Sequence, residues 1–136
     1  MLAAMVLGAE GVQMGTRFVA SEEASSHASF KEAVIHSQEG DTKLMMKKLT
    51  PVRMMKNKFF EEIQKAELSG ASEEELRLLL GRARAKKGMF EGNLDEGELE
   101  IGQISALVDN ILPAAAIVKQ IWSEFISALE TPLRKN

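Results

Sequence analysis

The sequence has no cysteine among its 136 residues and only two histidines. The lack of cysteine excludes a disulfide framework, a thiolate metal site and a cysteine nucleophile, and we expect no metal site. The formal net charge of -3 is small and has the wrong sign for a nucleic-acid-binding protein. The apolar residues 1–7 are too few to span a membrane. We therefore expect a cytoplasmic protein that binds neither nucleic acid nor membrane.

The polar residues offer no catalytic group that stands out. His27 falls in the first turns of a predicted helix and His36 at its end, where an imidazole favours the helix dipole. The basic segment 43–58 lacks aromatic side chains on which bases could stack, so we interpret it as a solvated face. The acidic segment 91–100 does not match the spacing of an EF-hand. We assign no catalytic residue to this chain.

Residues 11–19 predict a short strand followed by a tight turn. Val12 and Met14 alternate with small or polar residues, which lets a ligand approach one face closely. At the end of the strand, Gly15 and Thr16 leave backbone N–H groups and a hydroxyl free, an arrangement that suits a phosphate. By spacing alone, the usual explanation of a Gly-Thr turn is a tight turn between packed elements, and the pattern matches neither a P-loop nor the Rossmann glycine pattern.

The rest of the chain predicts mostly helices. A first helix is expected to end at Gly8. Because the chain begins within the last turns of this helix, we expect that further residues once preceded it. A second helix is expected over residues 21–37, capped by Ser21. The brief segment 42–46 is a poor strand candidate, and Pro51 interrupts any regular element after it.

Clear start signals mark the later helices. One is expected from about Asn57, and a capping box at residues 72–75 opens the next. Residues 88–102 predict an irregular acidic loop with four glycines, and a short helix is expected over 103–108. The face of the helix opened at residues 72–75 is formed by Leu76, Leu79, Leu80 and Ala83. The closing helix after Pro113 should bury Val118, Ile121, Trp122, Phe125 and Leu129.

Residues 7–19, Leu-Gly-Ala-Glu-Gly-Val-Gln-Met-Gly-Thr-Arg-Phe-Val, resemble the signature of the nitronate monooxygenase family, formerly called 2-nitropropane dioxygenases. The flavin-dependent enoyl-acyl-carrier-protein reductases share that signature. The resemblance continues through residues 22–31, 56–57 and 102–107, in the order found in the family. It therefore covers nearly the whole chain.

The resemblance implies an α/β fold, the C-terminal portion of an FMN-binding (β/α)8 TIM barrel that is mostly helical here with one clear barrel strand. The main-chain amides and the Thr16 hydroxyl would hold the FMN phosphate, while the preceding strand would run along the cofactor. A Gly-Gln pair at 102–103 would close a loop toward the flavin, although Ile101 stands where alanine is usual. A plain helix start is the alternative there. The implied cofactor-binding residues are Gln13, Met14, Gly15, Thr16 and Gln103.

The resemblance also implies three parts. Residues 1–40 would hold the last barrel strand, the phosphate-binding turn and the following helix. Residues 41–110 would form a helical insertion with the acidic glycine-rich loop, and residues 111–136 the C-terminal helix. A complete eightfold barrel takes about 250 residues, so we expect a fragment that lacks the family's catalytic histidine and is inactive alone.

The implied parent activity is the FMN-dependent oxidative denitrification of alkyl nitronates with O2. An FMN-dependent enoyl-acyl-carrier-protein reductase and a non-catalytic helical interaction module are the alternatives. The expected partner of the complete enzyme is a small molecule, either a nitronate or an enoyl thioester. The exposed edges of an incomplete barrel would favour association with another chain.

Overall fold

The computed structural model describes residues 1–131. Its elements, in chain order, are α1 (Leu2–Val6), α2 (Thr16–Val19), α3 (Ala28–Ile35), β1 (Thr42–Met45), β2 (Val52–Met55), α4 (Lys58–Leu68), α5 (Glu73–Leu80), η1 (Lys86–Phe90), η2 (Gln103–Leu107) and α6 (Ala114–Glu130). Of these, η1 is a π-helix and η2 a 3₁₀ helix. The last part of the expected segment 111–136, residues 132–136, lies outside the described residues.

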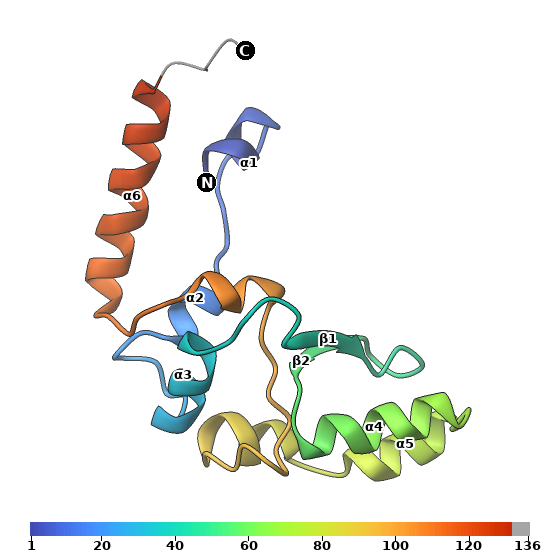
Figure 1. The fold of residues 1–136 in the computed structure, drawn as a ribbon. Helices are drawn as coiled ribbons and strands as arrows, with labels where there is room; N and C mark the ends of the chain where they lie inside the picture. Colours follow the sequence, from blue (N-terminus) through green and yellow to red (C-terminus); the bar gives the residue numbers. More distant parts are fainter. Residues whose placement is uncertain (132–136) are drawn as a thin grey trace.

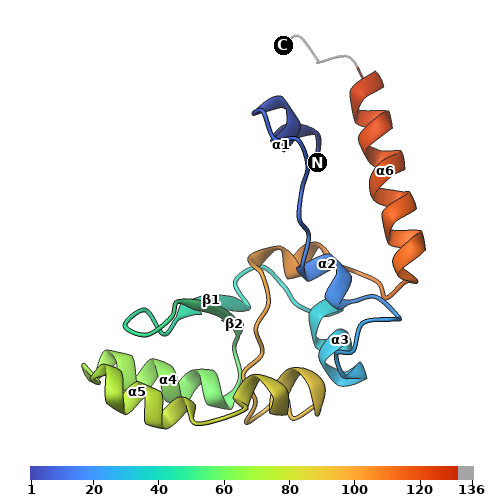
Figure 2. The same ribbon diagram turned by 180° about the vertical axis from the view of Figure 1, so that it is seen from behind.

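The elements form two regions joined by α2 and α3 (Figure 1). At one end, α1 and the extended segment after it run beside the long helix α6. At the other end, the β1–β2 hairpin lies against α4 and α5, and the reverse view shows the same separation (Figure 2). Among the described residues, no helix has the length and apolar character needed to cross a membrane.

The two strands of the described chain do not lie where the sequence predicts the barrel strand. Residues 11–14 are extended but pair with no other strand, and helix α2 already begins at Thr16. A strand is defined by its hydrogen-bonded neighbour, and no described residue forms a backbone hydrogen bond with this segment. The strands are instead β1 and β2, which pair antiparallel with Thr42 opposite Met55. Pro51 precedes β2, a position that a sheet tolerates.

The helix expected from Ser21 begins seven residues later, at Ala28. The Ser21 hydroxyl donates to Phe18 O over 2.8 Å and closes α2 instead of capping α3. His27 takes the capping role, because its Nδ1 accepts a hydrogen bond from Ser29 N over 3.2 Å. A hydroxyl that can cap a helix start can also bond a carbonyl at the preceding helix end, and the sequence does not separate the two.

The starts of α4 and α5 are confirmed. Asn57 Oδ1 accepts from Phe60 N over 2.8 Å, and Ser72 forms the expected capping box with Glu75. The expected face of α5 is too long at its end, because Ala83 lies beyond the helix with φ +61°.

The core consists of two apolar clusters, one on each face of the hairpin region. The cluster around α3 contains Ala20, Phe30, Val34, Met55, Leu99, Ile101 and Val108. The cluster between the hairpin and α4 contains Met45, Met46, Met54, Phe59, Phe60 and Ile63. Met54 and Met55 point to opposite faces because neighbouring side chains of a strand alternate. Strand β2 therefore contributes to both clusters.

The buried face expected for α6 is largely exposed. Ile117 and Phe125 are buried, but Trp122 is 59% exposed, and Val118 and Leu129 are exposed as well. The five-residue helix α1 packs against α6. Because α1 is so short, most of the apolar face of α6 has no described residue over it.

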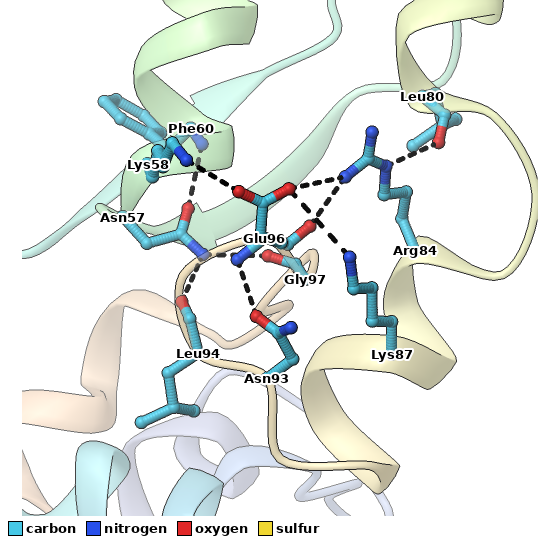
Figure 3. Close-up of polar contacts among 10 residues, drawn as sticks. All are labelled: Asn57, Lys58, Phe60, Leu80, Arg84, Lys87, Asn93, Leu94, Glu96 and Gly97. Atoms are coloured by element: carbon cyan, nitrogen blue, oxygen red, sulfur yellow. Dashed lines mark hydrogen bonds and ion pairs between the residues drawn. The ribbon is translucent and has the colours of Figure 1, made fainter.

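The acidic loop 88–102 is more regular than expected, since it begins within the π-helix η1. It is fixed to the start of α4 (Figure 3). Asn57 Nδ2 donates to Leu94 O over 2.6 Å and to Gly97 O over 2.8 Å. Lys58 Nζ lies 2.8 Å from Glu96 Oε1. This hydrogen bond raises the pKa of Lys58 and lowers that of Glu96. The loop is therefore held by the residues that start α4.

We expect Asn57→Ala to lower the free energy of unfolding by about 2 kcal/mol, because it removes a helix cap and leaves two carbonyls of the acidic loop without a donor. Ser72→Ala is the matched control, since it removes a cap that touches only its own helix, and it should cost about 1 kcal/mol. Urea denaturation measures both. Equal losses would show that the bonds from Asn57 to the loop do not contribute.

Candidate functional site

The turn at Gly15 and Thr16 opens backbone amides to an incoming group. Gly15 O accepts from Phe18 N over 3.0 Å and from Val19 N over 3.1 Å, which starts helix α2. Among the described residues, no acceptor is bonded to the amides of Gly15, Thr16 and Arg17. A Cβ added at Gly15 would meet nothing within 4 Å. Three successive amides are thus free at an uncrowded turn.

The same turn meets the second segment predicted to form the site. Thr16 Oγ1 accepts a hydrogen bond from Gly102 N over 3.1 Å, although 86 residues separate them. A Cβ at Gly102 would lie 2.5 Å from Thr16 Oγ1, so any other residue there would require the Thr16 side chain to move. Gln103 follows directly as the exposed first residue of η2. The structure therefore brings Thr16 and the start of η2 together.

Two other predicted residues precede the turn and point elsewhere. Gln13 is exposed, and Met14 is half-buried. The Met14 side chain helps to line an apolar cavity of about 180 Å³ against α6, together with Phe18 and Trp122. Among the described residues, no hydrogen bond joins Gln13 or Met14 to Gln103.

Arg17 holds the turn against the segment that leads to α6. Its Nη1 donates to Asn110 O over 3.0 Å and its Nη2 to Asn110 Oδ1 over 2.6 Å. The guanidinium is therefore occupied by a neutral asparagine. Sequence reasoning missed Asn110, which follows a short helix with no motif to mark it.

Lys31 fixes the chain that leaves α2, and sequence reasoning also gave it no role. Its side chain is buried, with 8% of the residue exposed, and Nζ donates to Ser21 O over 2.6 Å and to Glu22 O over 3.1 Å. The available signal was its place directly after Phe30 and three residues before Val34, on the apolar face of α3. A lysine on such a face needs a partner, and here backbone carbonyls supply it.

Within residues 1–131, no group of three or more histidine, aspartate or glutamate side chains is placed to hold a metal ion. The polar groups that the site offers are amide N–H groups and one hydroxyl. These are donors for an anion such as a phosphate.

An extended segment that ends in an open Gly-Thr turn, followed by a helix, is typical of α/β proteins that bind a phosphorylated cofactor. The family model described as nitronate monooxygenase matches residues 1–124. The chain belongs to the nitronate monooxygenase family.

The similar curated proteins are longer than this chain. A probable nitronate monooxygenase of Staphylococcus saprophyticus is 32% identical over 123 residues, which are 89% of this chain and 34% of that protein. A probable nitronate monooxygenase of Staphylococcus aureus is 44% identical over 69 residues, 48% of this chain and 19% of that protein. The chain thus spans about a third of the length of the first of these relatives.

Solved structures show the same relation. FabK from Thermotoga maritima matches with a TM-score of 0.86 and 35% identity, over 95% of this chain and 41% of that one. A nitroalkane oxidase from Streptomyces ansochromogenes matches with a TM-score of 0.73 and 24% identity, over 93% of this chain and 36% of that one. Both are TIM-barrel enzymes, and the described chain is a mostly helical part of that fold with two strands.

We expect Gly102→Ala to lower the free energy of unfolding by about 1–3 kcal/mol, because the new methyl group would collide with Thr16 Oγ1 and separate the two segments. Gly11→Ala is the control, since a Cβ there meets nothing within 4 Å. Urea denaturation of both variants checks this. A Gly102→Ala variant as stable as Gly11→Ala would mean that the two segments do not meet in solution.

Proposed function

We propose that this chain supplies the cofactor-phosphate site of an FMN-dependent oxidoreductase of the nitronate monooxygenase type. The observation that carries the proposal is the set of free amides at Gly15, Thr16 and Arg17, beside a Thr16 hydroxyl that is already oriented by Gly102. Membership of the family and the solved TIM-barrel relatives support it.

The donor set fits a phosphate group. Because Thr16 Oγ1 accepts from Gly102 N, its own proton remains free to donate to a phosphate oxygen. The neighbouring amides supply further donors, and the open side of Gly15 lets the oxygens approach the backbone. Arg17 is held by Asn110, so we assign the binding to neutral donors and not to a cation.

The extended segment before the turn is proposed to be the last strand of the barrel. Residues 10–14 make no backbone hydrogen bond with another described residue, although each non-proline residue carries a donor and an acceptor. A complete barrel takes about 200–250 residues or more. Pairing of both edges with neighbouring barrel strands would satisfy these groups and would place Gln13 and Met14 along the cofactor.

When bound, FMN would accept electrons from the nitronate carbon and pass them to O2. The residues of this chain would bind and orient the cofactor: the turn would hold the phosphate end, and Gln103 at the start of η2 would lie toward the flavin. We place no proton transfer on this chain, because neither histidine lies at the turn. His27 caps α3, and His36 Nδ1 lies 2.8 Å from Glu32 O.

An FMN-dependent enoyl-acyl-carrier-protein reductase is the second candidate. The likeness to the Thermotoga maritima FabK structure, at 35% identity, supports keeping it. Both candidates need the same phosphate site, so the residues of this chain do not separate them.

A comparison of FMN with riboflavin tests the proposed site, because the two differ only in the phosphate. We expect fluorescence quenching to show that the purified chain binds FMN at least about tenfold more tightly than riboflavin. A tenfold difference in affinity corresponds to the free energy of about one charge-assisted hydrogen bond. Thr16→Val should weaken FMN binding by a similar factor and leave riboflavin unchanged. Thr50→Val, in an exposed turn, is the control.

Two results would contradict the proposal. Equal affinity for FMN and riboflavin would show that the chain has no site for the phosphate. Unchanged FMN affinity in Thr16→Val would show that the phosphate binds away from Thr16. Nitronate-dependent oxygen uptake by the chain alone should be absent. Measurable uptake would show that the chain carries a catalytic group that we have not assigned.

A further inference from the structure

A second cavity, of about 420 Å³, lies between the β1–β2 hairpin and α5. The hairpin lies beside α4 and α5 in both ribbon views (Figures 1 and 2). The volume of the cavity is typical of small-molecule sites. The apolar part of its wall comes from Met46, Leu49, Val52 and Leu80, and two carboxylates, Glu98 and Glu100, belong to the segment that leads to η2.

Glu98 and Glu100 share one face of their segment. The segment runs antiparallel to β2, with Glu100 opposite Met54. Side chains two residues apart in extended chain point the same way, so both carboxylates project on the side of Met54, which packs in the cluster on α4. Leu99, between them, points the other way into the cluster around α3. The two carboxylates are therefore directed to the α4–α5 side, where the cavity lies.

Glu98 is buried without a partner. The residue is only 7% exposed, and its carboxylate makes no hydrogen bond or ion pair with any described residue. Glu100 also lacks such a partner for its side chain. Among the described residues, only the Ser105 hydroxyl is fully enclosed without a partner, so the Glu98 carboxylate opens to the cavity. A charge that is largely buried favours a partner, and one can reach Glu98 from the cavity.

The cation on the cavity wall does not neutralise this pair of carboxylates. Arg77 Nη2 lies 2.7 Å from Glu73 Oε1, one turn earlier on α5. Arg77 and Glu73 cancel each other in charge. The carboxylates of Glu98 and Glu100 are therefore not compensated by Arg77, and the remaining lining residues are apolar apart from Thr50.

We propose that this cavity binds a small organic cation, a primary ammonium on an apolar stem, with its head between Glu98 and Glu100. An ammonium has three N–H donors and no acceptor, which matches two unpaired carboxylates. The apolar walls would cover the stem of the ligand. A bare metal ion would need more oxygen ligands than the two carboxylates offer. None of the residues proposed to bind FMN lines this cavity, so the inference does not rest on the proposed function.

The protonation of Glu98 gives the site a pH dependence. Burial, with a smaller effect of the Glu100 charge, raises the pKa of the Glu98 carboxyl to about 7. The other charged groups that line the cavity are Glu73 and Arg77 from α5 and Glu100 from its own segment, and the hairpin adds only uncharged side chains. An ammonium pairs with the ionised form of Glu98. Affinity should therefore be full above pH 7 and should fall below it.

The test is calorimetric titration of the full chain with n-butylammonium chloride, without FMN. We expect binding at pH 8 that weakens about tenfold at pH 6, the effect of one pH unit below the pKa of a single linked group. n-Butanol, which has the same stem and no charge, should not bind. Potassium chloride at the same ionic strength should not displace the ammonium.

Glu98→Gln should weaken n-butylammonium binding at pH 8 at least about tenfold and remove its pH dependence, because one charged acceptor is lost. Glu61→Gln, on the exposed face of α4, is the matched control and should bind as the parent chain does. Equal binding of n-butanol, displacement by potassium, or unchanged binding in Glu98→Gln would overturn the proposal. The first two measurements use the unaltered chain, so they decide even if the variant fails to fold. None of these outcomes bears on the flavin proposal.

Discussion

The contact between Thr16 and Gly102 is the constraint on which the arrangement of this chain depends. Thr16 Oγ1 accepts from Gly102 N over 3.1 Å, and a side chain at position 102 would displace the Thr16 hydroxyl. Just before Gly102, Ile101 N donates to Arg53 O of β2 over 3.1 Å. The turn at α2, the start of η2 and the hairpin are therefore joined through one short segment, and the candidate phosphate site is as rigid as that segment.

Unpaired backbone groups and an exposed apolar helix face have the same physical origin in this chain. Residues 10–14 leave their backbone groups without a described partner, and α6 exposes Trp122 and much of its apolar face. Backbone polar groups and large apolar surfaces both cost free energy when they lack contacts of their own kind. The relatives with solved structures are more than twice as long over the same fold. Under the proposed function, neighbouring elements of a complete TIM barrel would supply these contacts.

The sequence was informative where the signal is local. The cap at Asn57 and the capping box at Ser72 follow from side chains that bond their own turn. The helix end at Gly8 follows from the positive φ that glycine adopts readily. The hairpin was missed because Pro51 and several lysines mask two short strands. The meeting of Thr16 with Gly102 was accessible only through the family resemblance, since no spacing rule relates residues so far apart. Neither a local signal nor the family resemblance predicted the contact of Arg17 with Asn110.

The segment 98–102 shows why distant partners are hard to predict and what they can achieve together. Its odd-numbered side chains enter the apolar cluster around α3, its even-numbered glutamates face the second cavity, and its last residue meets the turn at Thr16. Glu100 also borders the hollow beside Thr16. Arg53 borders the same hollow, so the two side chains act on an anion at the turn with opposite sign. A cation held between Glu98 and Glu100 would reduce the repulsion that comes from Glu100. By linkage, the reduction must act equally in both directions, so a phosphate at the turn would strengthen cation binding by the same factor.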